Sequence, residues 1–304
     1  MLQRIFSFGR QEAHPSDGGN PYDRMSVVTW VLVFGLILSL LVEAPATLVK
    51  FTALGSPVAL EFSAGLWMAV VLALAAAAGT ESIIRTHPRY RVHRNSLTWA
   101  YWALPMAITI ITVLVLPAVP TSFLQVLVVV TAGILLAFAF NSLYLTVESG
   151  QVGFRRARLV LNVLTYGAAL LLFLFVYQTR IRSLVSSTLV GVTATLLAIE
   201  LLRTWDRRAQ LVLAYGLIVG LLLGQVTWAL NYWPLLPGLT GGLLLLLTFY
   251  LSVIIAQHGL QERLTRRLLL ELVIFTLIAL ALIVLFAPGF VRQEGTLPLP
   301  PLAP

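Results

Sequence analysis

Four glutamates that each have an arginine nearby are the strongest candidates for chemistry in this chain of 304 residues. The pairs are Glu81 with Arg85, Glu148 with Arg155, Glu200 with Arg203, and Glu271 with Arg267. Three pairs have a spacing of three or four residues, which places both side chains on one helix face. Such carboxylates could line a cytoplasmic vestibule, because ionisable groups within membranes are often functional. The alternative is structural: the glutamates pair with the arginines and hold helix ends together, while the arginines reach lipid phosphates.

Polar side chains inside long apolar runs form a second group of candidates. Asn141 and Asn162 lie on either side of a basic loop, where they could form a hydrogen bond between two neighbouring helices or line a pocket for a lipid headgroup or a quinone. The segment GQVTWALNYWPL, residues 224–235, adds four more candidate pocket residues: Gln225, Trp228, Asn231 and Tyr232. Its aromatic residues are equally typical of the belt that anchors helices at a membrane surface.

A stripe of glycines precedes this segment. Gly216, Gly220 and Gly224 recur every four residues, and glycine at this spacing lets a neighbouring helix backbone approach closely. On a helical wheel, Trp228 and Asn231 continue the stripe, so we expect them to face a packed neighbour. Segment 224–235 is then a helix-packing seam that ends in an interfacial anchor.

The sequence lacks the motifs of several kinds of catalytic and metal site. The chain has no cysteine, which excludes disulfides, thiolate metal sites and thiol nucleophiles. It has no GxxxxGK[ST] nucleotide loop, no GxSxG elbow and no HExxH zinc motif. Its four histidines do not have the spacing of metal ligands. We therefore expect no metal, no cofactor and no catalytic residue, and an enzyme is the least favoured class of function.

The composition shows what must position these residues. Hydrophobic residues make up 59% of the chain and charged residues 11%, whereas a soluble domain carries about 25% charged residues. A membrane-spanning helix needs about 20 apolar residues, and nine segments qualify: 26–48, 63–84, 97–116, 123–145, 159–177, 183–202, 211–230, 235–256 and 268–286. The sequence therefore predicts an all-α, polytopic integral membrane helix bundle with about nine transmembrane helices.

The arginines predict the orientation of this bundle. Sixteen of the 20 lysines and arginines fall in alternate segments that begin with the N-terminus, so the positive-inside rule gives N-in and C-out. We expect a polar cytoplasmic tail over residues 1–24, a transmembrane domain over 25–290 and a proline-rich extracytoplasmic tail over 291–304. Residues 45–62 are expected to form an outer loop or a segment that dips into the membrane surface.

The net charge of +8 predicts an anionic partner. Because the charges lie in short loops between apolar spans, the expected anionic partner is lipid headgroups at the inner face, and not nucleic acid. Lys50 is the only lysine, which is typical of a GC-rich bacterial genome, so we expect a bacterial inner (cell) membrane. The sequences of Glu81–Thr86 and Glu200–Thr204 are similar, ESIIRT and ELLRT. This similarity leaves open an internal repeat of the kind that transporters have.

Three segments also resemble an uncharacterised family of bacterial multi-pass membrane proteins of unknown function: ESIIRTHP, YQTRIRSL and VTWALNYWPL. This resemblance implies a membrane location and carries no catalytic role. Two functions then remain in view. The first is a structural or accessory subunit of a membrane assembly, with a membrane-protein partner or a second copy. The second is a transporter or channel-like protein for a small solute, ion or lipid, against which stands the absence of charge near the middle of the spans.

Overall fold

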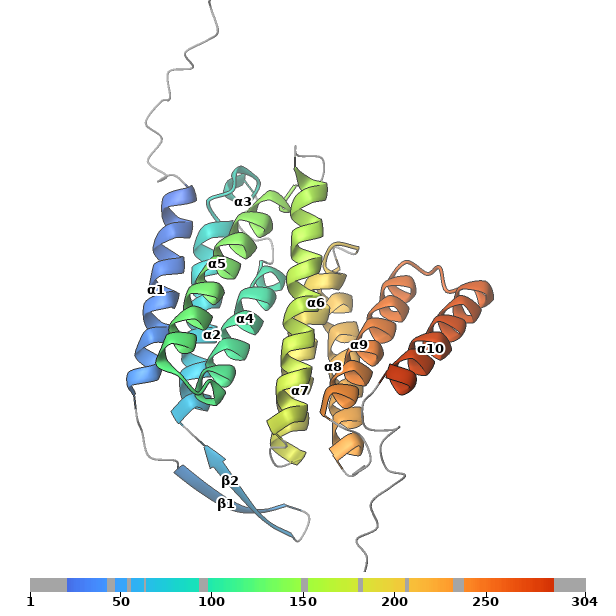
Figure 1. Cartoon of the computed structure of the whole chain (residues 1–304). Helices are drawn as coiled ribbons and strands as arrows, with labels where there is room; N and C mark the ends of the chain where they lie inside the picture. Colours follow the sequence, from blue (N-terminus) through green and yellow to red (C-terminus); the bar gives the residue numbers. More distant parts are fainter. Residues whose placement is uncertain are drawn as a thin grey trace, which may run out of the picture.

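The computed structural model describes residues 21–42, 47–53, 56–62, 64–92, 98–148, 153–179, 183–205, 208–231 and 238–286 (Figure 1). In chain order its helices and strands are α1 (Pro21–Leu41), β1 (Thr47–Ala53), β2 (Ser56–Phe62), α2 (Ala64–Ile84), α3 (Pro88–Val92), α4 (Ala103–Val115), α5 (Ser122–Leu145), α6 (Phe154–Thr179), α7 (Ser183–Leu202), α8 (Ala209–Asn231), α9 (Gly238–Leu260) and α10 (Arg266–Phe286). Short 3-10 helices flank α4 at Trp99–Tyr101 and Leu116–Ala118.

These elements form the predicted helical bundle. Among the described residues, eight helical segments are long and apolar enough to cross a membrane, from the segment Pro21–Leu41 to the segment Leu239–Leu260. Helix α10 occupies the ninth predicted span but is not among those eight. The bundle is therefore confirmed, while the count of nine and the N-in orientation stay predictions.

Helix α1 begins earlier than the sequence suggested. It starts at Pro21, inside the segment expected to be a polar tail, and ends at Leu41 rather than near residue 48. Proline is favoured at the first helical position because its fixed φ suits a helix and its missing N–H would have no partner there. Asp23 in the first turn adds a favourable interaction with the helix dipole.

Residues 47–62 are the clearest departure from an all-helical fold. Instead of an outer loop or a re-entrant segment, β1 and β2 form an antiparallel hairpin in which Thr47 pairs with Phe62 and Ala53 pairs with Ser56. The hairpin lies beyond the helix ends, opposite the end of the bundle where α1 begins (Figure 1).

The loops rich in arginine meet at one end of the bundle. Arg89 in α3 donates to the backbone oxygen of Val147 after α5, over 2.9 Å. Arg203 after α7 donates to the hydroxyl of Thr146, over 3.3 Å. Two spanning helices separate each of these loops from the next along the chain, so consecutive helices run in opposite directions.

Helices α7 and α8 approach each other most closely. Three glycines of α8 lie against α7: Gly216, Gly220 and Gly224. A Cβ added to Gly220 would stand 2.5 Å from the backbone oxygen of Gly191, and one added to Gly224 would stand 3.1 Å from that of Ser187. The neighbour of the stripe is thus the preceding helix, α7.

Candidate functional site

Glu200, near the C-terminal end of α7, is the most deeply buried charged group in the described structure. Its relative exposure is 0%, and the side chain of Arg203 is 7% exposed. The guanidinium of Arg203 holds the carboxylate through two atoms, with Nε 2.8 Å from Oε2 and Nη2 2.7 Å from Oε1. This bidentate geometry is the strong form of an arginine–carboxylate pair.

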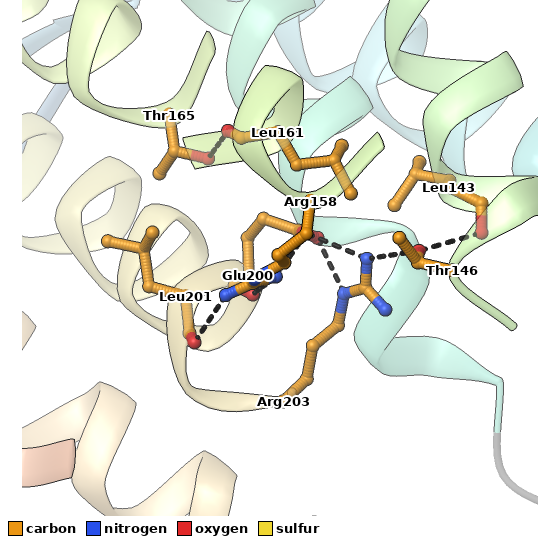
Figure 2. Close-up of polar contacts among 8 residues, drawn as sticks. All are labelled: Leu143, Thr146, Arg158, Leu161, Thr165, Glu200, Leu201 and Arg203. Atoms are coloured by element: carbon orange, nitrogen blue, oxygen red, sulfur yellow. Dashed lines mark hydrogen bonds and ion pairs between the residues drawn. The ribbon is translucent and has the colours of Figure 1, made fainter. Parts of the chain in front are cut away.

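A second arginine reaches the same carboxylate from α6 (Figure 2). Nη1 of Arg158 lies 3.6 Å from Oε1 of Glu200, and the side chain of Arg158 is 13% exposed. Its hydrogen bonds go to the backbone oxygens of Glu200, at 3.4 Å, and of Leu201, at 2.8 Å. Arg158 therefore caps the end of α7, where backbone oxygens have no partner within the helix.

Further contacts of Arg203 connect several elements of the fold. The guanidinium carbon lies 4.3 Å from the centre of the Tyr101 ring, a cation–π contact. The ring of Tyr90 in α3 packs edge-on against that of Tyr101. The Thr146 hydroxyl, which accepts from Arg203, donates to the backbone oxygen of Leu143. The cluster thus ties α3, the turn before α4, the end of α5, α6 and α7 together.

Glu81 occupies a related position at the end of α2. It pairs with Arg85, accepts a hydrogen bond from the Thr98 hydroxyl, and accepts another from the indole N–H of Trp102 over 2.8 Å. Glu81 is half-buried, whereas the Arg85 side chain is 55% exposed. Like Glu200, this carboxylate is engaged by fixed donors from a neighbouring segment.

The other two predicted pairs are at the surface. Arg267 and Glu271 form an ion pair of 3.1 Å on α10, but their side chains are 90% and 61% exposed. Glu148 is exposed and acts electrostatically on His87. The pairing of Glu148 with Arg155, which is exposed in the first turn of α6, stays a prediction.

His87 is the one buried imidazole among the described residues. It is 2% exposed and packs edge-on against Tyr144, with ring centres 5.0 Å apart. Its Nδ1 accepts a hydrogen bond from the backbone N–H of Arg89, over 3.3 Å. Burial lowers the pKa of His87 below its usual range; the charge of Arg89 acts in the same direction, and that of Glu148 opposes it.

The two predicted asparagines are not joined. Both are half-buried, but Oδ1 of Asn162 is buried without a hydrogen-bond partner, so Asn141 does not donate to it. The hydroxyl oxygen of Thr240, at the start of α9, is likewise buried and unpaired.

The candidates around segment 224–235 are spread over the outside of α8. Gln225 and Trp228 are exposed, and Trp228 has 52% of its surface accessible. Asn231 is also exposed, yet its amide donates to the Ser186 hydroxyl of α7 over 2.8 Å. Tyr232 lies outside the described residues. A pocket formed by these residues therefore stays a hypothesis.

Sequence reasoning missed two members of the cluster around Glu200: Arg158, which approaches its carboxylate, and Tyr101, which packs on Arg203. The predicted helix boundary explains the first omission, because α6 was expected to begin at residue 159, whereas the helix begins at Phe154. For Arg158, a helical wheel extended into the basic loop would have shown that it lies one turn from Asn162 on the same face.

Arginines hold both of the carboxylates described above. The carboxylate of Glu200 is held by Arg203 and approached by Arg158, and that of Glu81 is held by Arg85 and by the neutral donors of Thr98 and Trp102. Among the described residues, no group of three or more histidine, cysteine, aspartate or glutamate side chains is placed to hold a metal ion.

The alternating apolar helices and the arginine-rich end define a multi-pass helical membrane protein. Comparison with protein families gives one match, a protein of unknown function (DUF5656), which covers residues 44–286. The chain therefore belongs to the DUF5656 family. The match runs from just before β1 to the end of α10 and leaves α1 outside. Neither the curated proteins nor the solved structures contain a match to this chain.

Proposed function

We propose that this protein is a structural or accessory subunit of a membrane assembly in a bacterial inner (cell) membrane. The observation that carries the proposal is the exposure of the α10 side chains. None of the α10 side chains that the structure describes is buried, and α10 lies at the edge of the bundle beside α9 (Figure 1). Every spanning helix before it has buried residues.

The seam between α10 and α9 is narrow. The half-buried residues of α10 form one stripe, spaced three or four apart: Leu268, Leu272, Thr276, Ala279 and Ile283. Helices associate in a membrane through side-chain packing and hydrogen bonds, because the lipid is as apolar as the helices. A helix that packs along only one narrow stripe receives little stabilisation from its own bundle, and its other faces are available to a partner.

The buried charges support a structural role. A transport carboxylate must exchange its bound cation or proton, whereas Glu200 is closed off from solvent and held bidentately. Removing one partner from such a buried pair is costly, so this site favours a fixed bundle.

Site-specific photo-cross-linking in native membranes tests the proposal. Photoreactive residues at Ile274 and Leu277, which are 55% and 61% exposed on α10, should give an adduct of one defined size with another membrane polypeptide. Val163 on α6, 63% exposed, is the matched control and should react with lipid alone. If the α10 positions behave like Val163, the subunit proposal fails; adducts of two copies of this chain alone would replace it with a homo-oligomer.

A transporter or channel-like protein is the second candidate, and one observation favours it. Asn162 and Thr240 carry unpaired buried polar atoms inside the bundle, and polar groups in such a place commonly bind water or a ligand. Solute or ion flux through vesicles that contain only this chain, lost in Asn162→Leu, would support this second candidate over the first.

A further inference from the structure

The charges around Glu200 do not balance. One carboxylate faces two guanidinium groups, and Arg203 takes it bidentately at 2.7 and 2.8 Å. Arg158 approaches the same carboxylate only to 3.6 Å and is otherwise bound to two neutral backbone oxygens. The surplus positive charge of the cluster therefore resides on Arg158, and a largely buried charge without a full counter-ion is unfavourable.

A strip of polar side chains with unused hydrogen-bonding atoms begins at Arg158. Asn162 and Tyr166 follow at intervals of four residues, so the three side chains lie on one face of α6, each about 6 Å further along the helix. Oδ1 of Asn162 has no partner. In the part of the chain that the structure describes, no hydrogen bond engages the Tyr166 hydroxyl or Nε of Arg158.

The neighbours of this strip are aromatic and apolar. The Tyr166 ring lies 6.0 Å from that of Tyr250 and 6.1 Å from that of Phe249, both on α9. Tyr250 in turn lies 5.5 Å from Phe275 on α10. The strip thus changes from a cation near the helix end, through an amide, to phenol groups beside apolar rings.

We propose that Arg158, Asn162 and Tyr166 bind the phosphate-bearing headgroup of an anionic phospholipid. Arg158 pairs with the phosphate, which supplies the missing negative charge. Oδ1 of Asn162 accepts a hydrogen bond from a hydroxyl of the headgroup, its amide N–H and the hydroxyl of Tyr166 donate to the ester oxygens, and the acyl chains lie along α9 and α10. The succession of phosphate, ester and hydrocarbon in a phospholipid follows the order of groups along α6.

Native mass spectrometry of the purified full chain tests this site with dioleoylphosphatidylglycerol as the probe. The wild type should retain this lipid in preference to dioleoylphosphatidylcholine, which has no net charge. Tyr166→Phe, which removes one hydroxyl and leaves the ring packing, should weaken retention several-fold, and Arg158→Gln should weaken it by about tenfold. Asn162→Leu should act like Tyr166→Phe.

One control variant separates this site from general attraction to the arginine-rich end. Arg156→Gln removes an exposed arginine from the same turn of α6 and should bind the lipid like the wild type. Equal losses in Arg156→Gln and Arg158→Gln would overturn the proposal, as would unchanged retention in Tyr166→Phe. A free phosphate ion has the same charge chemistry, so displacement of the lipid by inorganic phosphate would assign the site to the free ion and overturn the lipid.

Discussion

Replacing Glu200 with glutamine should destabilise the bundle far more than any other change of a single carboxylate. The variant keeps the size of the side chain but removes the only carboxylate that, among the described residues, forms an ion pair with Arg158 and Arg203, whose side chains are 13% and 7% exposed. Breaking a buried ion pair by removing one partner costs about 3–5 kcal/mol, because the remaining charge stays buried without compensation. Here two guanidinium groups are left, so the upper part of this range applies.

The matched control is Glu271→Gln on α10. Its ion pair with Arg267 has a similar distance, 3.1 Å, but both side chains are largely exposed. Exposed pairs contribute about 0–1 kcal/mol, so this control should differ little from the wild type. Glu200→Asp, which keeps the charge on a shorter side chain, should fall between the two.

The assay is unfolding of the purified protein in a mild detergent by titration with a denaturing detergent, followed through the fluorescence of its seven tryptophans. The free energy of unfolding should fall in the order wild type and Glu271→Gln, then Glu200→Asp, then Glu200→Gln. If Glu200→Gln folds as stably as Glu271→Gln while an activity disappears, the structural interpretation of this cluster is refuted and the carboxylate serves transport.

Three further perturbations have expected outcomes. Gly220→Val should lower the free energy of unfolding by about 1–3 kcal/mol because the new side chain meets the backbone of α7, whereas Gly167→Ala, with open space around it, should be neutral or stabilising; equal effects in the same unfolding titration would contradict the close helix approach. Burial holds the pKa of His87 below its ordinary value of about 6.5, so the folded state prefers the neutral imidazole and stability should fall as pH drops below about 6.5. In His87→Gln, the free energy of unfolding should differ less between about pH 7.5 and about pH 5 than in the wild type. An unchanged difference would show that another group causes the pH dependence. Trp102→Phe should cost about 1–3 kcal/mol by removing a donor to Glu81, and a variant as stable as the wild type would show that the indole bond is dispensable.

Apolar segment length predicted most of the bundle. Helix α7 has the predicted bounds, 183–202, and α5 differs from its prediction only at its first residue, Ser122. These spans have polar or helix-stopping residues at both ends, so the apolar run and the helix coincide. Helix α6 begins before its apolar run, because alanine and arginine are good helix formers and the segment Arg155, Arg156, Ala157 and Arg158 extends the helix toward its N-terminus.

The hairpin at residues 47–62 could not be found by the same criterion. Its strands are seven residues each, too short to appear as spans, and Pro57 argues against a strand unless it lies at an edge. In a two-stranded sheet both strands are edges, so the proline is tolerated. The preference for a loop over a hairpin at this place was wrong for that reason.

The candidate site was only partly predictable. Spacing along one helix predicts pairs such as Glu81 with Arg85, whereas the partners of Glu200 that come from other helices depend on helix rotation and packing. The burial that distinguishes Glu200 from the exposed Glu271 is also a tertiary property, since both residues belong to arginine–glutamate pairs of nearly the same spacing.

The mass of the complex that carries this protein in native membranes tests the proposed function most directly. Extraction into polymer-bounded membrane discs, followed by native mass spectrometry, keeps weakly held helices and lipids together. We predict a mass that exceeds the 33.3 kDa of the chain by at least one other membrane polypeptide of fixed stoichiometry. A species of 33.3 kDa that carries only lipids, in every preparation, would contradict the account.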